Sequence, residues 1–192
     1  IIENDSINIL DYSNVYNGGG VGIGDFNNDG LQDIYFTGNL VSSKLYLNKA
    51  GLKFEDITDK SGTGGEGKWS RGVTVIDINN DGLQDIYVSA TISKDPQKRE
   101  NILYINKGNV EGGVPAFINE AKEYGLADTT HTTQSVFFDY DNDGDLDVYL
   151  CVNEIIPDLY PNQFRPVIKD GSFPSTGRLY RNDPDALSGH PY

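Results

Sequence analysis

Asp25-Phe26-Asn27-Asn28-Asp29-Gly30-Leu31-Gln32-Asp33 carries a side-chain oxygen at positions one, three, five and nine, and glycine at position six. The pattern returns as Asp77-Ile78-Asn79-Asn80-Asp81-Gly82-Leu83-Gln84-Asp85 and as Asp139-Tyr140-Asp141-Asn142-Asp143-Gly144-Asp145-Leu146-Asp147. We refer to these stretches as loop 1, loop 2 and loop 3. Their first residues are 52 and 62 positions apart. Such a period indicates a repeat architecture.

Short β-type runs flank every loop. They are rich in β-branched and aromatic residues and are bounded by Gly, Asn and Asp, which predicts strand, loop, strand. The runs before the loops are 21–24, 73–76 and 135–138, and those after them are 34–36, 86–88 and 148–150. A third strand is expected at Lys44–Asn48, Ile102–Asn106 and Arg178–Asn182, and a fourth at Lys53–Thr58 and Ala116–Glu120.

Four short strands in a unit of 50 to 60 residues predict an all-β fold built from β-propeller blades, each a sheet of four antiparallel strands. We expect one propeller segment over 1–192, with blades at about 18–62 and 70–125 and an incomplete blade at about 132–192. Closed propellers have typically four to eight blades. Because bare sheet edges template aggregation, we expect a longer native chain, or another chain, to cover the open edges.

The net charge of −14 is concentrated in the loops, which hold eleven of the 29 acidic residues. A local excess of carboxylates is where a cation is expected to bind. The sequence has no basic stripe, which argues against a nucleic-acid partner. It also has no run of 18 apolar residues, so no membrane span is predicted.

The loop spacing suits a hard dication such as calcium, which takes six to eight oxygen ligands. Alternate residues of a tight loop point the same way, and glycine at position six permits the turn that brings in the carbonyl of position seven. An EF-hand would have glutamate at position twelve, where this chain has Phe36, Val88 and Leu150. The alternative is that the loops are ordinary hairpin turns, which need no metal. This alternative does not explain well why mutually repelling carboxylates are clustered in all three loops. We therefore predict three structural calcium ions.

With three loops and their strands in register, the chain resembles the FG-GAP/VCBS repeat family from about Gly18 to Asn182. These are the calcium-loop blades of integrin alpha-subunit propellers and of many bacterial secreted and surface proteins. No intact Phe-Gly…Gly-Ala-Pro string is present, which favours the bacterial VCBS-type branch. The resemblance implies a fragment of a larger, seven-bladed propeller that is extracellular, periplasmic or at the cell surface.

The resemblance also implies a ligand set, in which positions one, three, five and nine give side-chain oxygens and position seven gives its carbonyl. The carboxylate of Asp145 is expected to lie outside this set. The implied ligands are Asp25, Asn27, Asp29, Leu31 and Asp33; Asp77, Asn79, Asp81, Leu83 and Asp85; and Asp139, Asp141, Asp143, Asp145 and Asp147.

A second candidate site lies on the face expected to be opposite the loops. Aligning the loops places Asn17, Trp69 and His131 eight residues before each one, with Arg71 two residues after Trp69. Since the inner strands of a propeller line its channel, Trp69, Arg71 and His131 form a possible ligand rim, for a protein or a glycan. The alternative is that Trp69 packs between blades and His131 is a surface loop residue.

These features favour a non-enzymatic, calcium-stabilised module for binding or adhesion. Alternatives are part of a carbohydrate-active enzyme, such as a polysaccharide lyase, or a passive spacer. The sequence offers no compact Ser-His-Asp set and no acid–base pair outside the loops, so no catalytic residue is nominated. The fold alone does not decide among these functions.

Overall fold

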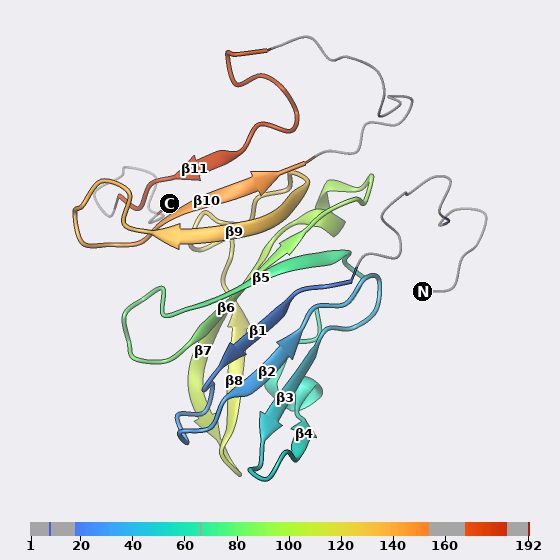
Figure 1. Cartoon of the computed structure of the whole chain (residues 1–192), viewed down its shortest axis with the longest axis vertical. Helices are drawn as coiled ribbons and strands as arrows, with labels where there is room; N and C mark the ends of the chain where they lie inside the picture. Colours follow the sequence, from blue (N-terminus) through green and yellow to red (C-terminus); the bar gives the residue numbers. More distant parts are fainter. Residues whose placement is uncertain (1–7, 9–17, 66, 154–167, 184–191) are drawn as a thin grey trace.

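The computed structural model describes residues 8, 18–65, 67–153, 168–183 and 192, which form an all-β fold. Three antiparallel sheets are stacked one on the next, as expected for propeller blades (Figure 1). In the described residues the helical segments are short, namely α1 (Thr58–Ser61) and the 3-10 helix η1 (Pro96–Arg99). No helix among the described residues is long and apolar enough to cross a membrane.

Each sheet is a meander in which strands that follow one another in the chain are paired. Sheet 1 contains β1 (Val21–Gly24), β2 (Asp33–Phe36), β3 (Lys44–Asn48) and β4 (Phe54–Asp56). Sheet 2 contains β5 (Ser70–Ile76), β6 (Asp85–Ala90), β7 (Ile102–Val110) and β8 (Val114–Asn119). Sheet 3 contains β9 (Thr132–Phe138), β10 (Asp147–Val152) and β11 (Arg178–Tyr180).

The strand predictions are confirmed with small differences at the ends. The fourth strand of the first unit ends at Asp56, two residues earlier than expected, because helix α1 begins at Thr58. The carboxylate of Asp56 accepts hydrogen bonds from the N–H (3.0 Å) and the hydroxyl (2.6 Å) of Thr58, which fixes this start. The described part of the third unit contains three strands.

The first strands of successive sheets lie beside one another. The N–H of Gly20, just before β1, donates to the carbonyl of Arg71 in β5 (2.8 Å). From β5, the Thr74 hydroxyl donates to the carbonyl of Ser135 in β9 (2.9 Å). A Cβ at Gly22 would lie only 2.9 Å from a methyl group of Val75, so glycine permits the close approach of β1 to β5.

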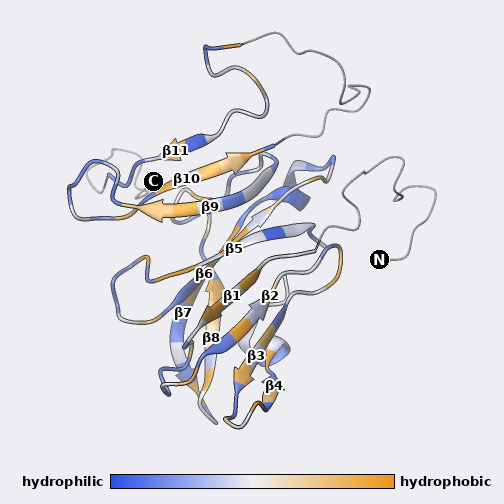
Figure 2. Ribbon diagram, viewed as in Figure 1, coloured by the Kyte–Doolittle hydropathy of each residue, from blue (hydrophilic) through white to orange (hydrophobic). Residues whose placement is uncertain are grey.

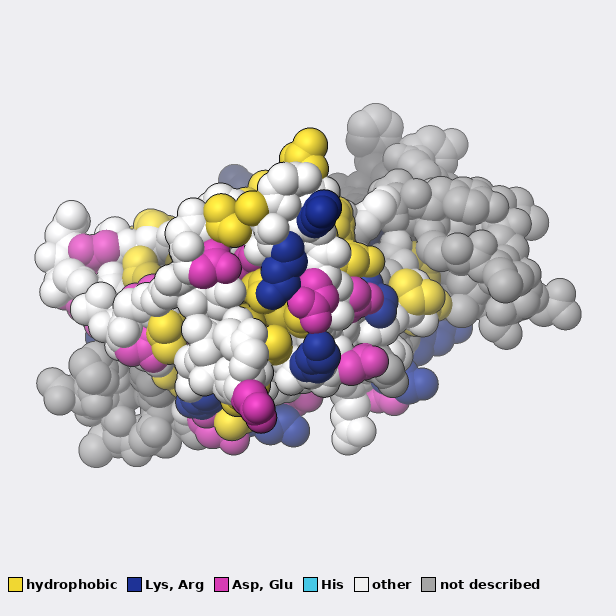
Figure 3. Space-filling model, turned by 90° about the horizontal axis from the view of Figure 1, so that it is seen from below, with side chains coloured by type: hydrophobic (Ala, Val, Ile, Leu, Met, Phe, Trp, Pro, Cys, Tyr) yellow, Lys and Arg dark blue, Asp and Glu magenta, His cyan; other side chains and the backbone are white. Residues whose placement is uncertain are grey.

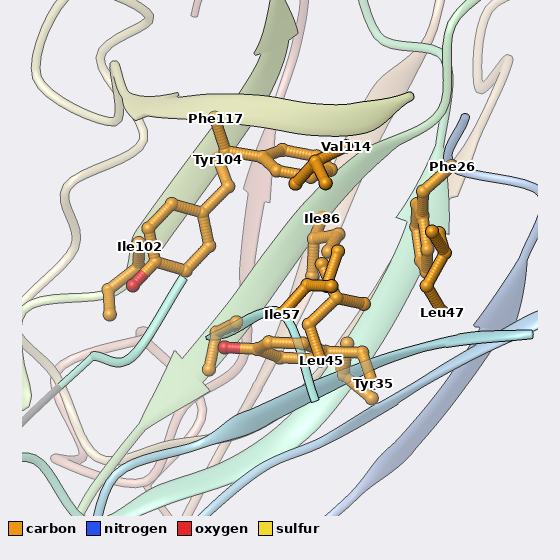
Figure 4. Close-up of a cluster of buried hydrophobic side chains, with 12 residues drawn as sticks. Phe26, Tyr35, Leu45, Leu47, Ile57, Ile86, Ile102, Tyr104, Val114 and Phe117 are labelled. Atoms are coloured by element: carbon orange, nitrogen blue, oxygen red, sulfur yellow. The ribbon is translucent and has the colours of Figure 1, made fainter. Parts of the chain in front are cut away.

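A hydrophobic core fills the space between sheets 1 and 2 (Figure 4). Sheet 1 contributes Tyr35, Leu45 and Leu47, which lie on one face because side chains alternate along a strand. Sheet 2 contributes the facing set of Val73, Ile86, Val88, Ile102 and Tyr104.

A second core between sheets 2 and 3 repeats this arrangement one unit later. Sheet 2 contributes Tyr87, Leu103 and Ile105, and sheet 3 contributes Val148, Leu150 and Val152. Tyr87, Val148 and Leu150 follow their loops at the same spacing as Tyr35, Ile86 and Val88 do in the first core. We call the face with Tyr87 and Leu103 the Tyr–Leu face, and the opposite face of each sheet, with Ile86 and Val88 in sheet 2, the branched face.

The copies of these faces at the two ends of the stack are exposed. On sheet 1 the branched face presents Val21 and Ile23, which are 54% and 60% exposed, and the exposed Phe36. On sheet 3 the Tyr–Leu face presents Tyr149 and Leu179. Hydrophobic residues are present in the strands that carry these faces, such as β1 and β10 (Figure 2). Such faces are the parts of a repeat array that ordinarily pack against a neighbour.

The end of the molecule seen from below carries basic and acidic side chains interspersed with one another (Figure 3). Ion pairs of this kind join β3 and β4, where Lys44 lies 3.0 Å from Asp56 and Lys49 lies 3.4 Å from Glu55. Both pairs are largely exposed, so each adds little to stability.

Candidate metal centre

The three acidic loops occupy equivalent places, because each joins the first strand of a sheet to the second. They project on the same side of the stack, to the left in Figure 1. The three sequence repeats therefore place their loops in a row along one side of the molecule.

Two residues in each loop have left-handed backbone conformation. Position six is glycine, with φ of +86° in loop 1, +84° in loop 2 and +96° in loop 3. Position four is asparagine, with φ between +55° and +63° at Asn28, Asn80 and Asn142. Asparagine tolerates this region better than most residues with a side chain. The pair Asn-x-Gly thus sets the course of the loop, and the sequence analysis had assigned no role to position four.

Carboxylates at positions one and five hold the loop backbone in a tight turn. The Asp25 carboxylate accepts from the N–H groups of Asp29 (3.0 Å) and Gly30 (2.8 Å). The Asp29 carboxylate accepts from the N–H of Leu31 (2.9 Å). The same bonds recur in loops 2 and 3 at 2.8–3.2 Å. Both carboxylates are therefore turned inward over the loop.

The aspartate at position nine is fully buried in all three loops. In loop 2, one oxygen of Asp85 accepts from the N–H of Ile78 (3.0 Å) and the other from the N–H of Asn106 in β7 (2.8 Å). Asp33 and Asp147 make the equivalent pairs of bonds at 2.7–2.9 Å. Position nine thus ties the loop to the third strand of its own sheet.

Three asparagines in the third strand, or just after it in the third unit, belong to this network, and the sequence analysis did not single them out. Asn48, Asn106 and Asn182 close the repeated Leu-Tyr-x-Asn of that strand, and each donates its N–H to the position-nine carboxylate. The side chain of Asn48 also donates to the carbonyl of Gln32, at position eight (2.9 Å). One such asparagine follows each loop, and this repetition is the sequence signal that could have identified them.

Burial shifts the pKa of several loop carboxyls upward. It raises the pKa of Asp85 to about 6, against the hydrogen bonds from Asn106 and Ile78, which lower it. Burial likewise raises the pKa of Asp33. In loop 3, burial together with the nearby Asp143 raises the pKa values of Asp141 and Asp145. A cation bound in a loop would oppose these shifts, because it favours the charged form.

Loop 3 brings three carboxylates together. One oxygen from each of Asp139, Asp141 and Asp147 lies within 4.8 Å of the other two. Calcium binds oxygen at roughly 2.3–2.6 Å, so two oxygens on one ion are at most about 5 Å apart. An all-oxygen donor set at this separation fits calcium. Loops 1 and 2 have the same hydrogen bonds around positions one, five and nine, with asparagine in place of Asp141.

The residues of the possible ligand rim lie at the other ends of the strands. Trp69 is 2% exposed and pairs its backbone with Asn39, which lies in the connection between β2 and β3. Arg71 and His131 are half-buried, and Nδ1 of His131 accepts from the N–H of Ile92 (3.2 Å). Burial lowers the pKa of Arg71. Asn17 lies outside the described residues.

Comparison with known families agrees with the resemblance read from the loops. The model of the FG-GAP-like repeat matches residues 10–88, a range that contains loops 1 and 2. This supports the FG-GAP assignment for that part of the chain and a propeller-type module. A search among curated proteins finds no matching sequence.

Proposed function

We propose that the chain is a calcium-stabilised propeller module that binds a partner outside the cell. The observation that carries the calcium part is the geometry of loop 3, where three carboxylate oxygens lie within the span of one calcium ion. The proposed ligands are the side chains of positions one, three, five and nine and the carbonyl of position seven in each loop.

The proposed ions act by stabilising the fold. A bound ion would supply a positive charge that neutralises carboxylates held close together by the loop backbone, so that its binding free energy becomes folding free energy. Extracellular calcium modules bind with Kd on the order of 0.1–1 mM. Sites of that strength would be filled outside the cell and largely empty in the cytosol, which supports an extracellular, periplasmic or cell-surface setting.

Calcium stoichiometry tests this proposal. Equilibrium dialysis is expected to find three calcium ions per chain, and two after the double substitution Asp139→Ala and Asp141→Ala. A matched double variant on the surface, Asp59→Ala with Asp170→Ala, should keep three. Retention of three ions by the loop variant, or no binding by the unmodified chain, would refute the assignment.

We place the partner, a protein or a glycan, on the end opposite the loops, where Arg71 and His131 keep part of their surface exposed. The double variant Arg71→Ala and His131→Ala is expected to reduce binding on a glycan array, or to a captured protein partner, while its circular dichroism spectrum stays that of the folded chain. Binding equal to that of the unmodified chain would exclude the rim. Release of unsaturated sugars from acidic polysaccharides would instead identify a lyase.

A further inference from the structure

Loop 1 is tied to sheet 2 by a set of side-chain hydrogen bonds. The amide oxygen of Gln84, at position eight of loop 2, accepts from the N–H of Asp25 (2.7 Å). The amide of Asn28 in loop 1 donates to the carbonyl of Gly82 in loop 2 (3.3 Å). From the β7–β8 hairpin, the amide of Asn109 donates to the carbonyl of Asn27 (2.8 Å). Loop 1 therefore rests on loop 2 and on the hairpin beside it.

The position-nine carboxylates of loops 1 and 2 are joined by a continuous chain of bonds. Asp33 accepts from the N–H of Phe26 (2.9 Å), and the carbonyl of Phe26 accepts from the side chain of Asn106 (2.9 Å). The backbone N–H of Asn106 then donates to Asp85 (2.8 Å). The Phe26 ring is buried edge-on against Phe117 of sheet 2, which holds this link in place. Phe26 and Asn106 thereby connect the two carboxylates by hydrogen bonds.

The corresponding junction between loops 2 and 3 is built differently. Position eight of loop 3 is Leu146, which has no amide to accept a bond. A Cβ at Gly24 would lie 2.3 Å from the Gln84 amide oxygen, so glycine leaves room for the bridge, whereas sheet 2 has Ile76 at the equivalent place. Within the described ranges no side-chain hydrogen bond joins loop 2 to loop 3. Among the described residues, one pair of loops is bridged and the other is not.

We infer that loops 1 and 2 form a coupled pair of calcium sites, while loop 3 binds independently. This rests on the proposed calcium binding and adds its regulation. An ion in loop 1 orders the peptide groups that Gln84, Asn106 and Asn109 contact. When an ion then binds in loop 2, less conformational entropy remains to be lost on ordering that loop. By linkage the effect is reciprocal.

Electrostatics acts in the opposite direction. An ion in one loop reduces the negative potential that attracts a cation to the other. At about 0.15 M salt, exposed charges are screened over roughly 8 Å, while hydrogen bonds are not. The ordering effect is therefore expected to dominate at physiological ionic strength, giving positive cooperativity.

Amide NMR resolves the three loops individually through Gly30, Gly82 and Gly144. In a calcium titration, the Gly30 and Gly82 signals are expected to shift together with a Hill coefficient above one, and Gly144 separately. The substitution Asp77→Ala, which disables loop 2, should weaken binding at loop 1 about five-fold, the low end of usual couplings, and leave loop 3 unchanged. Disabling loop 3 with Asp139→Ala should leave loops 1 and 2 unchanged.

Gln84→Leu tests the bridge directly, because it installs the residue that loop 3 has at that position. It should lower the Hill coefficient of the Gly30 and Gly82 titrations without abolishing the coupling, because the bonds from Asn28, Asn106 and Asn109 remain. In chelator it should speed hydrogen exchange at the Asp25 amide, which loses its acceptor. Gln32→Leu, the same change at the exposed position eight of loop 1, is the matched control and should keep the cooperativity. Independent titration of all three glycines in the unmodified chain would overturn the coupling alone. A lack of response at all three would overturn calcium binding itself.

Discussion

Calcium is expected to raise the thermal unfolding midpoint of this chain by roughly 10–25 °C relative to chelator. A ligand that binds only the folded state stabilises it by about 1.4–2.7 kcal/mol when present at 10–100 times its Kd. Three sites with Kd on the order of 0.1–1 mM in about 10 mM calcium would together contribute roughly 4–8 kcal/mol. In a chain of this size each kcal/mol moves the midpoint by about 2–4 °C. Circular dichroism at 215 nm follows the transition of the sheets.

Magnesium at the same concentration is the matched control. It prefers a smaller octahedral shell and sheds water reluctantly, so loops built around several converging carboxylates should gain much less from it. Sodium chloride at equal ionic strength accounts for charge screening. Midpoints that agree within a degree in calcium and in chelator would show that the loops are metal-free turns.

Asp85→Ala is expected to destabilise the protein much more in calcium than in chelator. In calcium the variant loses one ion and leaves the N–H groups of Ile78 and Asn106 buried without an acceptor. An unsatisfied buried donor costs about 1–3 kcal/mol, and the lost ion about 1.4–2.7 kcal/mol, so the total loss is roughly 3–9 kcal/mol. In chelator the variant also removes a buried charge. Since burial raises the pKa of Asp85 to about 6, the buried charge destabilises the folded state by roughly 3 kcal/mol at pH 7, and the variant removes this destabilisation.

Urea unfolding with and without calcium measures this difference. Asp85→Asn is the companion variant, because its amide oxygen can still accept one of the two N–H bonds and it should lose less. Asp59→Ala changes an exposed aspartate outside the loops and should alter stability by about 0.5 kcal/mol or less in both conditions. An equal loss for Asp85→Ala in calcium and in chelator would mean that the carboxylate serves only the backbone.

The fold was largely predictable because its signals are local and repeated. Runs such as Ile34–Phe36 and Ile86–Val88 follow identical loop spacings, so the strands could be placed from the sequence and then arranged as blades. The start of helix α1 was not predictable from hydrophobic period, because it depends on the hydrogen bonds that the Asp56 carboxylate accepts from Thr58. A helix of four residues has no period to detect.

The candidate site was predictable as a set of residues but not as a network. The spacing in each loop identified its carboxylates, and the structure places those at positions one, five and nine in equivalent bonds. The links from Gln84 and Asn106 to loop 1 join residues 59 and 80 positions apart, and no pattern within one repeat encodes them. The burial of Trp69 agrees with the alternative drawn from the sequence, in which this residue packs between blades instead of lining a rim.

The two faces of each sheet give the array a direction. The Tyr–Leu face of one sheet always meets the branched face of the next, as Tyr35 meets Ile86 and Tyr87 meets Val148. Each junction is therefore heterologous, because it joins two different faces. A blade inserted in reverse would place two faces of the same kind against each other. Blades of this chain could be exchanged or duplicated only in their original orientation. Their order along the polypeptide thus fixes the sense in which the assembly grows.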